Sequence, residues 1–75
     1  MRVQLTDHFR REQAADGVTE DEIARAWTRP EEDLPSREHP RARVRTAAQP
    51  DGTRVTVVGR QTAGRLLLIT TWRRT

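Results

Sequence analysis

The sequence predicts an α+β domain in which two N-terminal helices pack on a three- to four-stranded antiparallel sheet. Apolar residues recur at helical spacing before Pro30, and a complete helix-start signature lies at Thr19–Glu22. From Arg41 onward, polar and apolar residues alternate with the period of two that is typical of strands. Turn residues divide this second half into three strand-like runs. A chain of 75 residues has room for a single domain, which we place at residues 1–75.

The first segments combine a strand signal with a helix signal. Arg2–Leu5 alternates polar and apolar residues, which fits a short edge strand. Thr6 or Asp7 can cap a first helix that runs to about Ala15, with Gly17 as its stop.

The second helix has the strongest local signal in the chain. Thr19 and Glu22 form a capping box, and Val18 with Ile23 forms the matching hydrophobic staple. Pro30 ends the helix, because the residue before a proline is disfavoured in the helical conformation.

The remaining residues predict a loop followed by a three-stranded meander. Residues 31–40 form the loop, which Pro35 and Pro40 punctuate, and the later turns begin at Pro50 and Gly59. The strands are expected over residues 41–48, 53–58 and 65–72. The last run is nearly continuous in apolar residues, as expected of a central strand covered on both faces.

Charge is strongly polarised along the chain. Residues 1–36 carry nine acids against five arginines, a net of −4, whereas residues 37–75 carry nine arginines against two acids, a net of +7. Because the basic half is also the predicted sheet, its arginines should lie in rows on a rigid surface, which predicts a phosphate-rich partner. All fourteen basic residues are arginine, for which a GC-rich coding sequence is a sufficient reason.

A row of arginines marks one face of the first predicted strand. Arg41, Arg43 and Arg45 lie opposite the apolar side chains of that strand, and Arg54 and Thr56 join their face if the register allows. Such a row suits a nucleic-acid backbone. A solvated face, or ion pairs to the acidic helices, explains it equally well.

Two histidines are candidates for proton transfer. His8 shares a helical face with Arg11 and Glu12, so Glu12 can orient the imidazole and Arg11 can bind a phosphate beside it. His39 lies in the loop before the arginine row. An imidazole titrates near neutrality and suits RNA cleavage. The alternatives are an exposed helix histidine and a simple polar connection.

The end of the last strand offers further binding groups. The hydroxyl of Thr70 can bind phosphate, and Trp72 can stack on a base. Alternatively, Trp72 and Trp27 both belong to the core and Arg73 is part of a basic tail. The consecutive acids at 31–33 diverge and indicate a solvated loop, so we expect neither a metal site nor another cofactor.

Composition also limits partners and compartment. Without cysteine, no disulfide stabilises this short chain, so a homodimer or a tight partner is expected to help. The longest apolar run, Leu66–Ile69, is far too short to span a bilayer, and the N-terminus lacks the apolar core of a signal peptide. We therefore expect a cytoplasmic protein without a membrane partner.

Several short motifs resemble a known group of domains. They are Leu5–His8, Gly17–Thr19 followed by Glu22–Ile23, Pro35–Pro40 and Ile69–Arg73. In these the chain resembles small bacterial domains of unknown function that are grouped with the BrnT and RelE toxins, in the barnase-like ribonuclease class. The resemblance implies a compact RelE/BrnT-like α+β domain whose sheet face cleaves RNA without a metal. His8 matches the histidine of the first helix, but Glu12 and Asp16 stand where the family usually has arginines.

Two functions follow as hypotheses. The first is an RNA-binding, toxin-like domain acting as a metal-independent ribonuclease of a type II toxin–antitoxin system, held by an acidic antitoxin. Its catalytic candidates are His8, His39, Arg43, Arg45 and Arg73, and its RNA-binding candidates are Arg11, Arg41, Arg54, Thr70 and Trp72. The second is a non-catalytic interaction or regulatory module with the same fold, which the acids at positions 12 and 16 favour.

Overall fold

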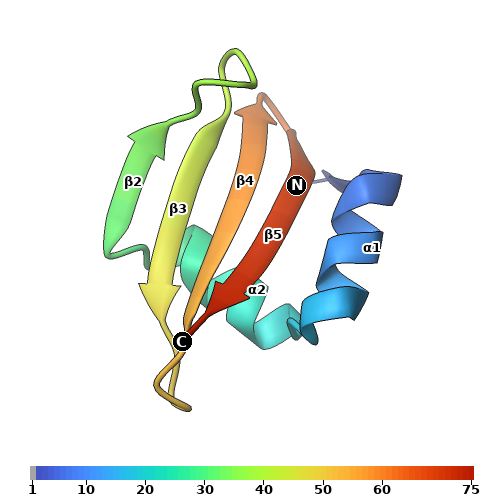
Figure 1. Ribbon diagram of the computed structural model, residues 1–75. Coiled ribbons are helices and arrows are strands. Elements are labelled where there is room, and N and C mark those ends of the chain that lie inside the picture. The colour runs from blue at the N-terminus through green and yellow to red at the C-terminus, as the bar shows by residue number, and fades with distance from the viewer. Residues whose placement is uncertain (1) are drawn as a thin grey trace.

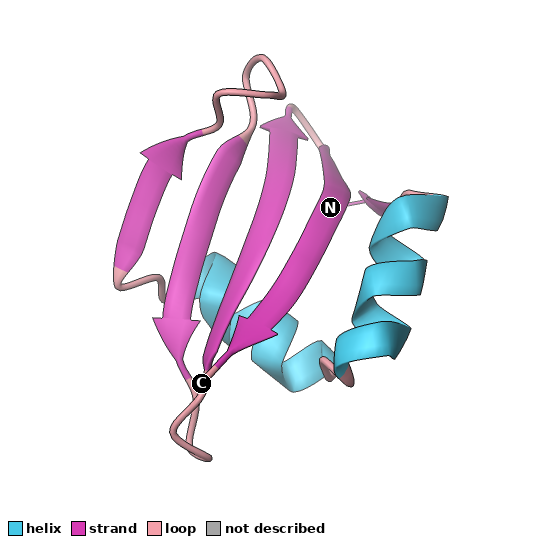
Figure 2. Ribbon diagram, viewed as in Figure 1, coloured by secondary structure: helices cyan, strands magenta, loops and turns pink. Residues whose placement is uncertain are grey.

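The computed structural model describes residues 2–75; Met1, included in the predicted domain, lies outside the described residues. The elements are β1 (Arg2–Leu5), α1 (Asp7–Asp16), α2 (Glu20–Thr28), β2 (Glu32–Pro35), β3 (Arg43–Ala48), β4 (Arg54–Thr62) and β5 (Arg65–Arg74). The strands form one sheet in the order β1-β5-β4-β3-β2. In Figure 1, α2 lies behind β3 and β4, α1 lies beside β5, and no helix stands in front of the sheet. Colouring by secondary structure shows the same uncovered face (Figure 2).

The prediction of an α+β fold with two helices is confirmed, but the expected sheet is wrong in strand number and direction. The sheet has five strands and is mixed, since β1 pairs in parallel with β5 while the other neighbours are antiparallel. β2 forms within the segment predicted as a loop. Its charged residues have little strand propensity, and it exists because β3 supplies backbone partners and arginines for its acids.

The predicted helix boundaries are confirmed at both starts. The Thr6 hydroxyl accepts a hydrogen bond from the Phe9 amide at 3.0 Å, and Gly17 ends α1 in the left-handed conformation with φ of 60°. At α2, Thr19 and Glu22 exchange both bonds of the capping box, at 3.2 and 2.9 Å. These local signals are enough to fix where each helix starts, because each cap satisfies backbone amides that the helix itself leaves unpaired.

The core lies between the helices and one face of the sheet. Its buried members are Phe9, Val18, Ala26, Trp27, Ala47, Val55, Val57, Leu66 and Leu68. Trp27 lies directly against β4 at Gly59, where an added Cβ would stand 3.0 Å from two of the indole carbons. A residue without a side chain is needed there, since even one methyl group would crowd the indole ring.

The register decides which side chains face the helices. Arg43, Arg45 and Ala47 alternate with the residues of the uncovered face, and Arg45 pairs with Val57 of the core. The arginine row therefore lies on the helix side of the sheet, contrary to the outward surface that we expected. Arg54 and Thr56 pair with residues of the uncovered face and do not join the row.

Two further expectations about the strands are wrong. Arg41 lies in the turn between β2 and β3, with φ of 66°, and belongs to no strand. β5 is central, between β1 and β4, but the helices cover only one of its faces. Its apolar composition misled this prediction because Leu67 and Ile69 belong to the uncovered face, where they are only partly buried.

Candidate functional site

A groove of about 590 Å³ lies on the uncovered face of the sheet. The start of α1, the β2–β3 loop and the three strands β3 to β5 form it. Its lining residues are Thr6, His8, Ser36, Arg37, Glu38, His39, Val44, Val58, Ile69, Thr70 and Trp72. The groove thus brings together four of the predicted site residues, namely both histidines, the threonine and the tryptophan.

His8 reaches the groove because Thr6 fixes the start of α1 to β5. The Thr6 hydroxyl donates a hydrogen bond to the carbonyl of Ile69 at 2.9 Å, and its amide donates to the carbonyl of Leu68 at 3.1 Å. His8 is two residues further along, in the first turn of the helix, and is exposed. Within residues 2–75, no hydrogen bond or ion pair joins His8 to Glu12, the expected orienting partner.

His39 is held by a closed loop between β2 and β3. The amide of His39 donates to the Ser36 hydroxyl at 3.1 Å, and its carbonyl accepts from the Ala42 amide at 3.0 Å. The Ser36 amide also donates to the Ala42 carbonyl at 2.9 Å. These three bonds fix the loop without secondary structure, so the partly buried His39 has a defined place at the groove.

The floor of the groove includes an irregularity in β5. Val58 pairs with Thr70 and Gly59 with Leu68, so Ile69 is an extra residue without a partner on β4. Such bulges turn side chains locally and often occur at functional sites. Trp72 follows on the same face and is only partly buried, unlike Trp27, which is 7% exposed in the core.

The predicted catalytic arginines of β3 lie on the other side of the sheet, away from this groove. Arg43 and Arg45 both bind Asp33 of β2, with Nε–carboxylate distances of 2.9 and 3.2 Å. Arg45 also donates to the Trp27 carbonyl at 2.8 Å, and its guanidinium lies 4.1 Å from the centre of the indole ring. Burial opposes ionisation of Asp33, but hydrogen bonding to Arg43 and the charges of both arginines lower its pKa overall. This geometry gives both arginines a structural role.

Arg73, the third predicted catalytic arginine, joins the helices to the end of the sheet. It donates to both carboxylate oxygens of Glu22, at 2.5 and 2.7 Å, and forms an ion pair with Asp51 at 3.3 Å. It also donates to the carbonyls of Asp16 and Gly17, at 3.3 and 2.9 Å. The hydrogen bond from Arg73 lowers the pKa of Glu22 to about 2, and the same contact raises the pKa of Arg73.

The other predicted RNA-binding arginines do not line the groove either. Arg54 binds Glu31 and Glu32, at 3.5 and 3.2 Å, so its charge is balanced by β2 and the residue before it. Arg11 lies exposed on α1, and Arg41 lies at a separate pocket of the uncovered face.

Four polar residues that line the groove were missed by the sequence reasoning. They are Thr6, Ser36, Arg37 and Glu38; Arg37 supplies a guanidinium to the groove that the histidines line. Thr6 was recognised only as a helix cap. Ser36 has a usable signal, because a serine three residues before a histidine can accept the backbone bond that folds the loop back.

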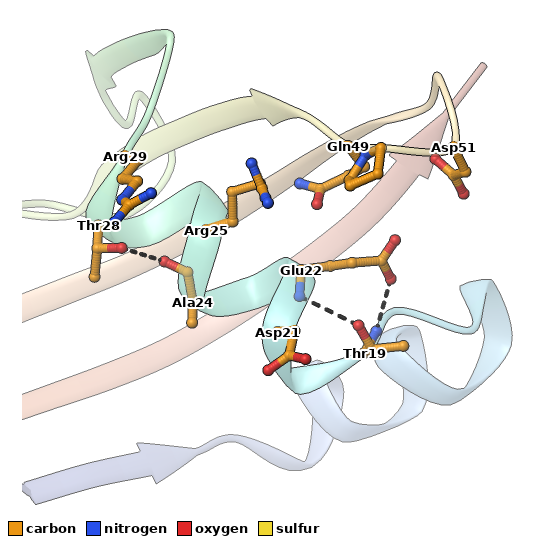
Figure 3. A pocket seen from close by; sticks show the side chains of 10 residues that line it. Thr19, Asp21, Glu22, Ala24, Arg25, Thr28, Arg29, Gln49 and Asp51 are labelled. Atoms are coloured by element: carbon orange, nitrogen blue, oxygen red, sulfur yellow. Dashed lines mark hydrogen bonds between the residues drawn. The ribbon is translucent and has the colours of Figure 1, made fainter.

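A second cavity, of about 630 Å³, lies between α2 and the β3–β4 turn (Figure 3). Its acids serve the fold, since Glu22 binds Thr19 and Arg73 while Asp51 accepts two bonds from Thr53, at 2.6 and 2.9 Å. The carboxamide Oε1 of Gln49 is buried there, without a partner in the described chain. In the part of the chain that the structure covers, no group of three histidine or acidic side chains is placed to hold a metal ion.

The Glu22–Arg73 contact predicts an acid-sensitive component of stability. Because folding lowers the pKa of Glu22 from 4.5 to about 2, its contribution is complete above pH 4.5 and is lost as the pH falls toward 2. Glu22→Gln should therefore lose less stability than the parent between pH 4.5 and pH 2, measured as the urea midpoint. Glu20→Gln keeps the pair and should follow the parent, and equal pH profiles for parent and Glu22→Gln would contradict the assignment.

Comparison with known proteins returned no match to a protein-family model, a curated protein or a solved structure. In the described residues, no helix is long and apolar enough to cross a membrane. The features of this small α+β domain that point to a function are the uncovered sheet face and its groove, since helices cover the other face.

Proposed function

We propose that this chain binds single-stranded RNA across the uncovered face of its sheet and cleaves it in the groove between His8 and His39. The observation that carries the proposal is that both histidines of the chain line one groove, together with Thr70 and Trp72. The two histidines come from distant segments, a helix start and a loop, and each segment is fixed by hydrogen bonds.

The proposed reaction is an internal transesterification. One imidazole, which we assign to His8, removes the proton of a ribose 2′-hydroxyl as that oxygen attacks the adjacent phosphorus. The bond from phosphorus to the 5′-oxygen breaks, and the second imidazole, of His39, supplies the proton that the leaving oxygen takes up. The products are a 2′,3′-cyclic phosphate and a free 5′-hydroxyl. Arg37 is the groove residue suited to stabilise the extra negative charge of the transition state.

The partly buried Trp72 and the hydroxyl of Thr70 suit the binding step. An exposed aromatic face can stack on any base, which favours single-stranded RNA over a rigid duplex. This proposal replaces Arg43, Arg45 and Arg73 as catalytic groups, since carboxylates already bind all three. In a type II toxin–antitoxin system, an acidic antitoxin would inhibit by covering the same face.

His8→Ala tests the catalytic assignment. The cleavage rate of a single-stranded RNA should fall roughly 10²-fold while RNA affinity stays unchanged, because a general base acts in the transition state. EDTA should have no effect, because the proposed reaction uses no metal ion. Arg10→Ala, an exposed change on the same helix, is the matched control. Equal cleavage by His8→Ala would show that the site is wrong.

A parent protein that is inert on RNA would favour the second candidate, a non-catalytic interaction module. A specific feature supports it: an apolar groove of about 730 Å³ on the helix side, lined by residues that include Val3, Leu5 and Ile23. Val3 is 56% exposed there, so this groove presents apolar surface to solvent. Growth on induction separates the two functions, because only a ribonuclease toxin should arrest it.

A further inference from the structure

Three arginines from different segments lie together on the uncovered face, at the end of the sheet where a turn joins β4 to β5. Arg41 comes from the β2–β3 turn, Arg60 from β4 and Arg65 from β5, and they line one pocket of about 360 Å³. Its other lining residues are Gln4, Thr62 and Leu67, so no acid contributes to it. The pocket therefore combines three positive charges with neutral hydrogen-bonding side chains.

These three arginines have no carboxylate partner among residues 2–75, unlike four other arginines of the sheet. Four arginines of the sheet, at positions 43, 45, 54 and 73, form ion pairs with acids. None of the three at the pocket forms one with any residue from 2 to 75. Arg2 adds a fourth charge, since it stands opposite Arg65 in the β1–β5 register. Like charges so placed repel unless an anion lies between them.

The pocket continues the groove along the same strands. Arg60 follows Val58 by two residues on β4, and Leu67 precedes Ile69 by two residues on β5. Two residues of a strand span about 7 Å, so the arginines stand directly beside the groove. A polymer that lies in the groove and follows β4 and β5 toward their turn passes over all three.

We infer that Arg41, Arg60 and Arg65 form a phosphate-binding subsite that anchors the RNA backbone next to the groove. The inference rests on the proposed function and adds the path of the strand to it. The arginine fork binds phosphate oxygens in pairs, and Thr62 and Gln4 can donate further bonds. Such contacts position a strand without reading its sequence, so affinity at this subsite should not depend on the bases.

The test compares Arg60→Gln/Arg65→Gln with the parent in titrations of a short labelled single-stranded RNA over a salt series. Affinity at low salt should fall at least tenfold, and the slope of log affinity against log salt should become shallower by about 1.4, since each lost phosphate contact on a single strand contributes about 0.7.

Arg25→Gln/Arg29→Gln is the matched control, since it removes the same charge from the last turn of α2 and its C-cap. An equal loss of RNA affinity in this control, or an unchanged salt slope in Arg60→Gln/Arg65→Gln, would overturn the subsite. Neither outcome affects the proposed groove, which the cleavage rate of His8→Ala tests separately. A parent that binds no RNA would overturn both proposals. Arg41→Gly gives an independent variant that removes one guanidinium from a position where glycine accepts the positive φ, and its slope should change by about half as much.

Discussion

Trp27→Ala is expected to lower the free energy of unfolding by about 3–5 kcal/mol, the usual cost of removing a buried aromatic side chain. The indole contacts Gly59 and Leu68 of the sheet and carries the guanidinium of Arg45 on its ring. Its removal therefore leaves a cavity and uncovers the guanidinium of Arg45, which keeps Asp33 and the backbone carbonyl of residue 27 as partners. Urea unfolding followed by circular dichroism measures the change.

Trp72→Ala is the matched control for this prediction, because the chain has only these two tryptophans. Trp72 lies on the uncovered face and is only partly buried, so its removal should cost about half as much stability or less. It should instead weaken RNA binding through the lost stacking surface. Equal destabilisation by the two changes would contradict the division of the sheet into a covered and an uncovered face.

Arg73→Ala is expected to lower the free energy of unfolding well beyond the effect of removing an exposed arginine, because it breaks a partly buried ion pair. The side chain is 19% exposed and connects Glu22 of α2 with Asp51 and Thr53 of the β3–β4 turn. Its loss leaves the Glu22 carboxylate with the capping contacts to Thr19 alone. The result should appear as a lower urea midpoint at neutral pH.

The neighbouring arginine provides the control for this change. Arg74→Ala removes the same charge from an exposed position and should alter stability by less than about 0.5 kcal/mol. The double variant Arg73→Ala/Glu22→Gln should lose less than the sum of the two single losses, since it removes the unpaired carboxylate along with its partner. A strictly additive loss in the double variant would show that the two side chains do not stabilise the fold as a pair.

The helices were predictable from the sequence because their signals are local. The caps at Thr6 and Thr19 and the stop at Gly17 lie within a few residues of the backbone groups that they satisfy. Strand β2 was not predictable in the same way. Glu32 and Asp33 become part of a strand only through arginines more than ten residues later in the chain, on β3 and β4.

The arginine row illustrates a different limit of sequence reasoning. Alternation correctly separated Arg43 and Arg45 from Val44, but it defines two faces and not which of them the helices cover. Because the face of β3 that carries Val44 is apolar, we expected the helices to cover it, and this expectation was wrong. The long aliphatic stems of arginine can lie against a core while their charges reach an acid, as Arg45 does at Trp27.

For the candidate site, the sequence predicted which residues take part better than it predicted how they are arranged in space. His8, His39, Thr70 and Trp72 were chosen for their chemistry, and the fold brings these four to one groove. The exposed arginines beside it, at positions 60 and 65, were not chosen, since Arg60 fell within a predicted turn and Arg65 was the first residue of a predicted strand. β4 extends beyond Val58, the end expected from its sequence, because it pairs with β5 as far as Thr62, opposite Arg65.

The parallel pairing of β1 with β5 has a consequence for how the chain folds during synthesis. Thr6 bonds to Ile69, 63 residues later, so β1 leaves the ribosome long before its only partner strand exists. Until β5 emerges, both helices lack part of the sheet that covers them, and the contacts of highest sequence separation form last. The domain is therefore expected to fold in one cooperative step that cannot be completed before β5 has emerged.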